Sequence, residues 1–445
     1  MSTRCGPPSV SVCIPVRNGQ DHLRHTLVNL LVHSTYPPDR WEVLLGDHES
    51  TDATSTIIAD FQERFPCVRS IRVPFHGPNR ACVRNKMIEE SKGELLVFID
   101  HDVLVSDQLL WKHVEAHDQF PSSIVAGAIF GIVLDRDLGR FSGQLQLDHI
   151  SASHSVLASS HELSDPRMRS GSVPEGIDAV DVLQAPAPFR FFWGGNLSAY
   201  QSDIDACGRF DEAYDGWGLE DDDFAQQFRV GGRGMAFSPA AWAFHLPGNG
   251  NGWNQLAEWR QNFDTFFRKF TTREIEGYSV YGSALLPLGM ARLEGFLGEL
   301  RLIDTSATLA RAAPRLGPPH GRRLCHFVVD TYVAQALHLT DALSPFGTLT
   351  ETHRLDGRTH WWPLFGFRTP FADKEIDEVV ILVEVVMWLD RYTLTLVLGE
   401  TARIARRAVF CCGADTEVRA GGFPVKVLRE ILSTLNFASF TWMTV

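Results

Sequence analysis

Two groups of carboxylates have the residue types and spacing that chemistry requires. Residues 220–223 are four consecutive acids, and they follow the loop 215–218, which reads Asp-Gly-Trp-Gly. Adjacent negative charges repel one another, so their placement needs a physical reason. The start of a helix is one reason, because the unpaired backbone N–H groups and the helix dipole favour acids there. Proton transfer is another, because an ionised carboxylate at the mouth of a pocket accepts a proton from an incoming nucleophile.

The second group is Asp100-His101-Asp102, directly after the apolar run from Leu95 to Ile99. Two carboxylates at positions i and i+2 beyond a strand can converge on one hard divalent cation, and Mg²⁺ and Mn²⁺ prefer such oxygen ligands. A polar turn after a buried strand produces the same short pattern. The triplet alone leaves both interpretations open.

Apolar runs that alternate with segments of helical spacing surround the second group. The pattern predicts strands over 9–16, 41–45, 68–73 and 94–99, and helices over 21–33, over 79–91 and in a stretch that ends at Phe61. Strands interleaved with helices indicate βαβ units and a parallel sheet, in which ligands bind beyond the carboxyl ends of the strands. We therefore expect an α/β domain with Asp100 and Asp102 at its ligand-binding edge.

Four segments of this region together resemble family 2 glycosyltransferases. They are 9–18 (Ser-Val-Ser-Val-Cys-Ile-Pro-Val-Arg-Asn), 47–52, 84–85 and 100–102, in the order and spacing of that family. The resemblance implies a GT-A fold over residues 1–270, which is a Rossmann-like nucleotide-diphospho-sugar transferase domain. It also implies Mn²⁺ or Mg²⁺ as cofactor and a site for the nucleotide sugar made by Pro15, Asp47, Arg84, Asp100 and Asp102.

Three later segments resemble the catalytic domains of chondroitin-polymerase-type enzymes and β-1,4-galactosyltransferases. They are 193–196 (Trp-Gly-Gly-Asn), 208–223 and 241–247. This resemblance implies that Asp221 is the catalytic base and that Glu220 lies beside it at the acceptor. It further implies contacts with substrate from Trp193, Gly195 and Asn196. Trp217 either stacks on an acceptor sugar or closes the loop, and we favour stacking because aromatic faces suit the C–H side of sugars.

The same resemblance makes His245 the residue that completes the metal site with Asp100 and Asp102. Outside this context, a histidine after an apolar run is usually a satisfied core residue. The aspartates Asp102 and Asp221 stand where polypeptide GalNAc-transferases, which retain configuration, typically carry His and Asn. The sequence therefore favours inversion at the anomeric carbon.

The implied activity is a metal-dependent transfer of a hexosyl or N-acetylhexosaminyl group from a UDP-sugar to a hydroxyl of a glycan or glycoconjugate. Residues 47–50 read Asp-His-Glu-Ser, whereas the family commonly has Asp-Asp-Gly-Ser, and Arg17 replaces a common Tyr. Both departures lie near the pocket expected for the nucleotide base. UDP is therefore the expected nucleotide, but these residues do not establish it. Two alternatives stay open: an acceptor that is a peptide or a small natural product, and a non-catalytic scaffold that binds a sugar nucleotide.

Composition limits the remaining possibilities. The 445 residues have a formal net charge of -13, which argues against nucleic acid as a partner. The segment 1–8 lacks the pattern of a signal peptide, and charges at Glu384, Asp390 and Arg391 interrupt the longest apolar run, so we expect no transmembrane segment. Eight cysteines without a Cys-x-x-Cys pair indicate a reduced, cytoplasmic setting.

The remaining segments resemble no family. Residues 149–188, rich in Ser, Ala, Pro and His, predict a loop or lid. Helical stretches around 324–343 and 376–398 predict that residues 271–445 form a mainly α-helical region, with a possible linker at 311–323. Its role is open, and binding of a partner or formation of a homo-oligomer are both compatible with it.

Overall fold

The computed structural model divides the chain into two compact units, residues 1–266 and 267–445. This boundary lies close to the one expected at residue 270. The structure describes residues 6–131, 165, 167, 173–174, 176–185, 187–246, 252–279, 306–316, 318–319, 321–326, 335, 337, 339–343, 359–362, 364, 366, 368–386, 391–412, 425–435 and 440–444.

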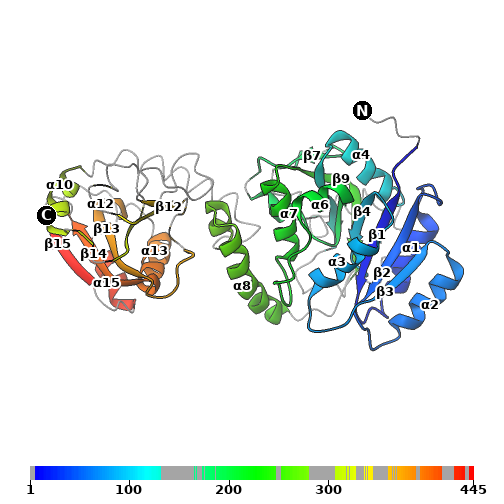
Figure 1. Cartoon of the computed structure of the whole chain (residues 1–445), viewed down its shortest axis with the longest axis horizontal. Coiled ribbons are helices and arrows are strands. Elements are labelled where there is room, and N and C mark those ends of the chain that lie inside the picture. Colours follow the sequence, from blue (N-terminus) through cyan, green and yellow to red (C-terminus); the bar gives the residue numbers. More distant parts are fainter. Residues whose placement is uncertain are drawn as a thin grey trace. The chain divides into compact units, whose positions relative to one another are not determined.

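The N-terminal unit is built on a nine-stranded mixed sheet with the order β3-β2-β1-β4-β8-β6-β9-β5, in which β7 also pairs with β9 (Figure 1). The strands from β3 to β4 are parallel, and β8 runs antiparallel between β4 and β6. The strands are β1 Val10–Val16, β2 Trp41–Asp47, β3 Val68–Arg72, β4 Leu95–Ile99, β5 Val103–Val105, β6 Ser123–Phe130, β7 Val180–Asp181, β8 Asn196–Tyr200 and β9 Gly234–His245.

Helices cover both faces of the parallel part of this sheet. The helices are α1 Leu23–His33, α2 Thr54–Arg64, α3 Arg80–Glu90, α4 Leu109–Gln119, the 3-10 turn η4 Pro188–Phe191, α6 Gln201–Cys207, α7 Glu220–Val230 and α8 Gly252–Lys269. Figure 1 shows α1 and α2 on one side of β1 to β3 and α3 on the other. Because both faces are covered, the strands read as continuous apolar runs. The predicted strands and helices before residue 100 are confirmed, and so is the α/β fold class.

Aromatic packing brings α7 to the end of β4. Phe224 of α7 stacks on Phe210 with ring centroids 4.0 Å apart, and its ring lies 6.4 Å from that of Phe98 in β4. All three side chains are buried. This packing places the first turn of α7, which holds residues 220–223, beside the strand that delivers Asp100.

A second parallel sheet lies in the C-terminal unit. Its six strands have the order β12-β11-β10-β13-β14-β15 and are all parallel. The strands are β10 Arg323–Cys325, β11 Asp341–Leu343, β12 His360–Trp362, β13 Ile376–Leu382, β14 Ala405–Cys412 and β15 Phe440–Thr444, and the helices are α10 Ser306–Leu316, α12 Val383–Val386, α13 Arg391–Ile404 and α15 Val425–Thr434. The order reverses between β10 and β13, as in doubly wound α/β folds.

The prediction for this unit needs correction. Helices are present, as expected, but the region also contains a sheet that the sequence analysis did not anticipate. The stretch 376–382 was expected to be helical and forms β13. Short apolar runs do not distinguish a buried strand from a buried helix, and the β-branched residues there favour the strand. The possible linker at 311–323 is not a linker, because α10 covers its start and Arg323 opens β10.

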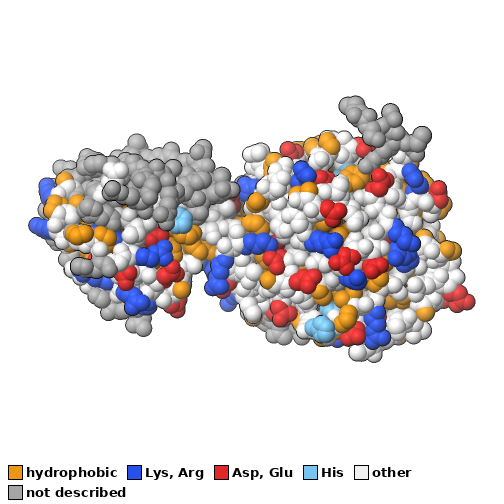
Figure 2. All heavy atoms as spheres, viewed as in Figure 1, with side chains coloured by type: hydrophobic (Ala, Val, Ile, Leu, Met, Phe, Trp, Pro, Cys, Tyr) orange, Lys and Arg blue, Asp and Glu red, His pale blue; other side chains and the backbone are white. Residues whose placement is uncertain are grey.

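Two further predictions concern parts of the chain that the structure describes only in part. Most of the predicted loop or lid at 149–188 lies outside them. Among the residues that are described, no helix combines the length and the apolar character needed to cross a membrane. On the face drawn in Figure 2, basic and acidic side chains are interspersed over both units. The net negative charge therefore does not gather into one acidic patch on that face.

Candidate active site

The predicted metal ligands gather at the carboxyl end of β4. Asp100 follows this strand directly, and Asp102 precedes β5. β5 runs antiparallel to β9, with Val103 opposite His245, the last residue of β9. The Leu246 N–H donates to the Asp102 carbonyl over 2.7 Å. Strand pairing therefore brings a histidine from far along the chain to Asp102.

The geometry of His245 and Asp102 suits a cation. His245 Nδ1 lies 2.7 Å from the Leu246 carbonyl, and because a carbonyl only accepts, Nδ1 carries the proton in the neutral ring. The lone pair of Nε2 is then free to bind, and Nε2 lies 3.7 Å from Asp102 Oδ2. Asp102 Oδ1 is buried and has no hydrogen-bond partner among the described residues. A buried carboxylate oxygen without a partner is costly, and a bound cation would remove that cost.

Asp100, the third predicted ligand, faces a different partner. Its Oδ1 lies 3.6 Å from a terminal nitrogen of Arg84. Burial raises the pKa of Asp100, but the positive charges of Arg84 and Arg80 outweigh it, so the net shift is downward and the carboxylate is ionised. Within the described part of the chain, no three His, Cys, Asp or Glu side chains converge as a metal site. The structure thus pairs Asp102 with His245 and turns Asp100 toward Arg84.

Arg84 joins the two groups of carboxylates. Its guanidinium donates to Glu220 Oε1 over 2.9 Å, in addition to its contact with Asp100. The Arg84 side chain is 2% exposed and that of Glu220 5%. Burial lowers the pKa of Arg84, but Glu220 and Asp100 raise it further, so the guanidinium stays charged. An arginine from α3 therefore ties the end of β4 to the start of α7.

Asp221 has the proton affinity expected of a general base near neutral pH. Its Oδ2 accepts the Gly194 N–H and its Oδ1 accepts the Asp222 N–H, each over 2.9 Å. Burial, with the negative charge of Glu220, raises the pKa of Asp221 to about 6, while Arg84 and the Gly194 N–H oppose the rise. At pH 7 the carboxylate is mostly ionised and still basic enough to accept a proton.

The other two acids of the run have different surroundings. All four lie in the first turn of α7, as the helix-start interpretation expected. Asp223 is fully buried and accepts the Tyr214 hydroxyl over 2.8 Å. Burial, with the negative charges of Asp221, Glu220 and Asp223, raises the pKa of Asp222 well above its usual value. The four acids of the run therefore differ in their hydrogen-bond partners and in their surroundings.

The turn 193–195 fits tightly between these groups. A Cβ at Gly194 would lie 2.3 Å from an Arg84 nitrogen, and one at Gly195 would lie 3.0 Å from Asp100 Oδ2. Glycine is required at residue 194, because any side chain would displace the buried guanidinium. The predicted Trp193 and Gly195 are thus at the site.

Asn196 does not contact substrate space, contrary to its predicted role. It is fully buried, and its amide nitrogen donates to the carbonyls of Ala128 and Ala241 over 3.0 and 2.8 Å. Its oxygen lies 2.9 Å from His113 Nε2. The side chain holds strands of the sheet together, which a sequence motif does not distinguish from ligand binding.

Trp217 remains available for an acceptor. It is 37% exposed, and its backbone N–H donates to Glu258 Oε2 over 2.8 Å. Asn262 of α8 donates to the carbonyls of Asp215 and Gly218 over 2.9 and 3.0 Å. The sequence analysis missed Glu258 and Asn262, because no motif marks a helix that holds a loop so distant along the chain.

The expected nucleotide pocket lies at the carboxyl ends of β1 and β2. Pro15 pairs with Gly46, and Asp47 Oδ1 accepts the Ser50 N–H over 2.9 Å. Arg17 lies over the Phe75 ring, 3.3 Å from its centroid, and donates to the His48 carbonyl. The sequence analysis did not predict a role for Phe75. The only hint was that Arg17, which packs on the Phe75 ring, departs from the residue that is common in the family.

Comparison with known proteins shows what the N-terminal unit is similar to. Residues 11–163 match the model of glycosyl transferase family 2, and residues 177–241 match that of the N-terminal domain of galactosyltransferase. Both matches lie in the N-terminal unit, which is therefore similar to family 2 glycosyltransferases. Its GT-A fold and the resemblance inferred from the sequence are confirmed, and the chain is a glycosyltransferase.

Individual relatives extend the comparison. The glycosyltransferase is 25% identical over 391 residues to the validoxylamine A glucosyltransferase of Streptomyces hygroscopicus subsp. limoneus, with 84% of each chain covered. It is 24% identical over 241 residues to the chondroitin synthase of Pasteurella multocida, covering 51% of this chain and 24% of that one. A structure of S. aureus TarS 1–349 with UDP-GlcNAc matches with a TM-score of 0.43 and 17% identity, over 59% of this chain and 65% of the other.

Proposed function

We propose that the protein is a metal-dependent, inverting glycosyltransferase that uses a UDP-sugar. The observation that carries the proposal is the contact of Arg84 with both Glu220 and Asp100. It holds a basic carboxylate, Asp221, beside the strand end where the sugar diphosphate is expected. A base on one side of the donor and an anion site on the other are what an in-line displacement requires.

The roles of the residues follow from this arrangement. Asp221 accepts the proton of the acceptor hydroxyl as its oxygen attacks the anomeric carbon, and the bond from that carbon to the diphosphate oxygen breaks. Attack opposite the leaving group inverts the configuration. Asp102 and His245 would hold Mn²⁺ or Mg²⁺, which supplies positive charge to the departing diphosphate. Pro15, Asp47 and Arg84 line the donor side, and Trp193, Gly195 and Trp217 the acceptor side.

The relatives favour a small-molecule acceptor over a polymer. The similarity to the validoxylamine A glucosyltransferase covers 84% of both chains, whereas the similarity to chondroitin synthase covers 51% of this one. The first match includes the C-terminal unit, and the second is about as long as the catalytic unit alone. We therefore propose a validoxylamine-type acceptor first, and a glycan acceptor second.

Measurement of UDP release tests the proposal. The full chain is mixed with UDP-glucose, UDP-galactose, UDP-GlcNAc or UDP-GalNAc, with validoxylamine A or a chondroitin oligosaccharide, and with Mn²⁺, Mg²⁺ or EDTA. We expect metal-dependent release with at least one pair and, by NMR, a β-linked product from the α-linked donor. An α-linked product would overturn inversion. Donor binding without release from any pair would favour the scaffold alternative.

A further inference from the structure

A buried ion pair lies next to the site and has no assigned role. Asp165 and Arg167 have side chains 0% and 2% exposed, and their closest oxygen and nitrogen are 2.5 Å apart. Arg167 Nε also lies 3.0 Å from each carboxylate oxygen. Removing two charges from water costs several kcal/mol per ion. A buried pair therefore needs good geometry and further hydrogen bonds to its remaining polar atoms.

The pair connects the sheet to the segment that leads into the active site. Asp165 accepts the Ile129 N–H over 2.7 Å, and Arg167 donates to the Gly127 carbonyl over 2.9 Å. Both partners belong to β6. Arg167 donates with another nitrogen to the Phe191 carbonyl over 2.5 Å. Phe191 ends η4, two residues before Trp193.

The guanidinium also packs directly on Trp193. Its central carbon lies 4.1 Å from the Trp193 ring and 4.9 Å from the Phe237 ring. A planar cation between two aromatic rings fixes the ring planes as well as the distance, which a lysine ammonium would not do. The Trp193 side chain is therefore held by a group that is itself held by β6.

Trp193 directly precedes the glycine that bonds to the catalytic base. The Gly194 N–H donates to Asp221 Oδ2 over 2.9 Å, and a Cβ at residue 194 would lie 2.3 Å from an Arg84 nitrogen, so the backbone here passes close to the guanidinium. A displacement of the Trp193 backbone would change the position of this N–H relative to Asp221. We infer that Asp165 and Arg167 are positioning residues of the transfer reaction, which align the turn 193–195 and keep its N–H on Asp221. This inference rests on the proposed role of Asp221.

The pH dependence of kcat/KM reports on this bond. The groups that face Asp221 are Glu220 and Asp222 from α7 and Arg84 from α3. Because the N–H stabilises the ionised carboxylate, its loss would make Asp221 more basic. In Arg167→Lys we expect the acidic limb of the profile to move up by about one pH unit, together with a lower kcat. Asp165→Asn, which keeps the shape of the acid, should give a smaller shift of the same sign.

Arg323→Met is the matched control. Arg323 forms a buried ion pair with Glu378 in the other unit, with 2.7 Å between Nε and Oε1. Loss of this pair should lower thermal stability and leave the acidic limb in place. An equal shift in the control would show that the profile reports general destabilisation, and would overturn the inference.

Hydrogen exchange measures the same alignment without turnover. We expect the peptide over residues 191–199 to exchange at least tenfold faster in Arg167→Lys and Asp165→Asn than in the wild type and in Arg323→Met. Unchanged exchange in both folded variants would overturn the inference. Absence of UDP release by the wild type would instead refute the proposed function, while the exchange result would still show whether the pair positions the turn. If Arg167→Lys does not fold, Asp165→Asn alone decides.

Discussion

Both units contain a sheet in which the order of the parallel strands reverses. Next to that reversal, the charged residues of the two units lie at opposite ends of the strands. In each, the order of parallel strands reverses, between β1 and β4 in one and between β10 and β13 in the other. In the catalytic unit, Asp100 follows β4 at its carboxyl end. In the C-terminal unit, Arg322 lies before β10 and bonds to Asp341, the first residue of β11, over 2.7 Å. Reversal of strand order offers a place for a ligand, and the residues decide whether chemistry occurs there.

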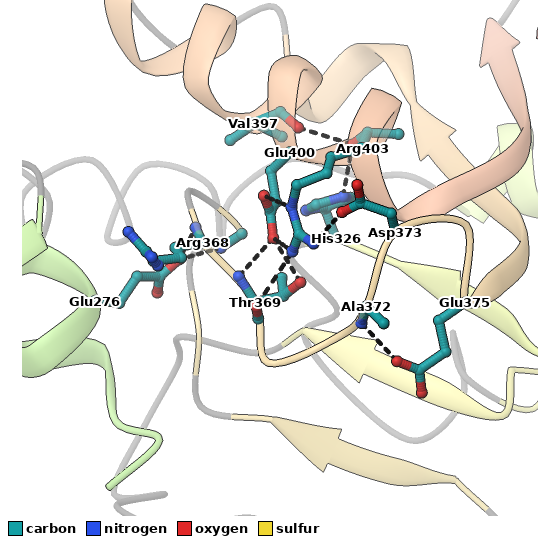
Figure 3. A network of polar contacts seen from close by, with 12 residues as sticks. Glu276, His326, Arg368, Thr369, Ala372, Asp373, Glu375, Val397, Glu400 and Arg403 are labelled. Atoms are coloured by element: carbon teal, nitrogen blue, oxygen red, sulfur yellow. Dashed lines mark hydrogen bonds and ion pairs between the residues drawn. The ribbon is translucent and has the colours of Figure 1, made fainter. Parts of the chain in front are cut away.

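A second network in the C-terminal unit also serves structure. Glu400 near the end of α13 accepts the Thr369 N–H over 2.6 Å and pairs with Arg403 over 2.6 Å (Figure 3). Glu276 accepts the N–H groups of Gly366 and Arg368 over 2.8 and 3.1 Å. Both acids therefore accept backbone N–H groups of the segment 366–369, and Glu400 also bonds to Arg403. In the catalytic unit, by contrast, Asp102 Oδ1 is buried and has no hydrogen-bond partner among the described residues.

The largest effect should come from removing the base. Asp221→Asn keeps the shape but cannot accept the proton, so we expect kcat to fall by about 10² to 10⁴-fold with UDP binding nearly unchanged. The measurement is UDP release, with donor affinity from calorimetry. Glu400→Gln is the control, and it should lower stability without a comparable loss of kcat. Weaker UDP binding by Asp221→Asn would place this residue on the donor side instead.

The next largest effect should come from removing a buried charge. Arg84→Met leaves Glu220 and Asp100 without their cation, and we expect a loss of about 3 to 5 kcal/mol in the free energy of unfolding. Arg406 pairs with Asp377 over 3.6 Å in the C-terminal unit, and their side chains are 67% and 50% exposed. Arg406→Met should cost about 0.5 kcal/mol or less. Urea denaturation compares the two variants, and equal losses would contradict the view that burial distinguishes them.

The metal prediction gives a smaller effect. His245→Gln removes one of the two side chains that face each other, and we expect metal affinity in the UDP-release assay to fall about 10 to 100-fold. His326→Gln is the control, because His326 follows β10 in the other unit and bonds to Thr401 with Nε2 to Oγ1 at 3.0 Å. A metal titration unchanged in His245→Gln would make His245 a core residue.

Sequence reasoning succeeded where local pattern determines structure. Alternating apolar runs located β1 to β4, whereas the roles of Asp102, His245 and Asp221 stay predictions. It failed where a long-range partner decides the role. Asn196 belongs to a recognisable motif, yet its environment is set by β6 and β9, and nothing local shows that. In the C-terminal unit, the short apolar run of β13 is compatible with a helix as well as with a strand, and its pairing with β10 and β14 stabilises the strand.

The smallest expected effect distinguishes two polar contacts, that of His113 with Asn196 and that of Arg403 with Glu400. His113 lies in the catalytic unit, and burial lowers its pKa to about 4 despite the bond to Asn196. In the C-terminal unit, by contrast, the pKa of Arg403 is raised, chiefly by its bond to Glu400. Charge is therefore excluded from the first contact and kept in the second.

Acidification should act on the first contact alone. Between about pH 6.5 and 4 the unfolded His113 binds a proton that the folded one does not, so stability must fall as pH falls. From pH 7 to 5.5 we expect the wild type to lose about 1 kcal/mol more than His113→Gln in the free energy of unfolding. Urea denaturation at both pH values measures this difference. Parallel losses would mean that His113 takes up its proton in the folded protein, so that charge is not excluded from its contact with Asn196.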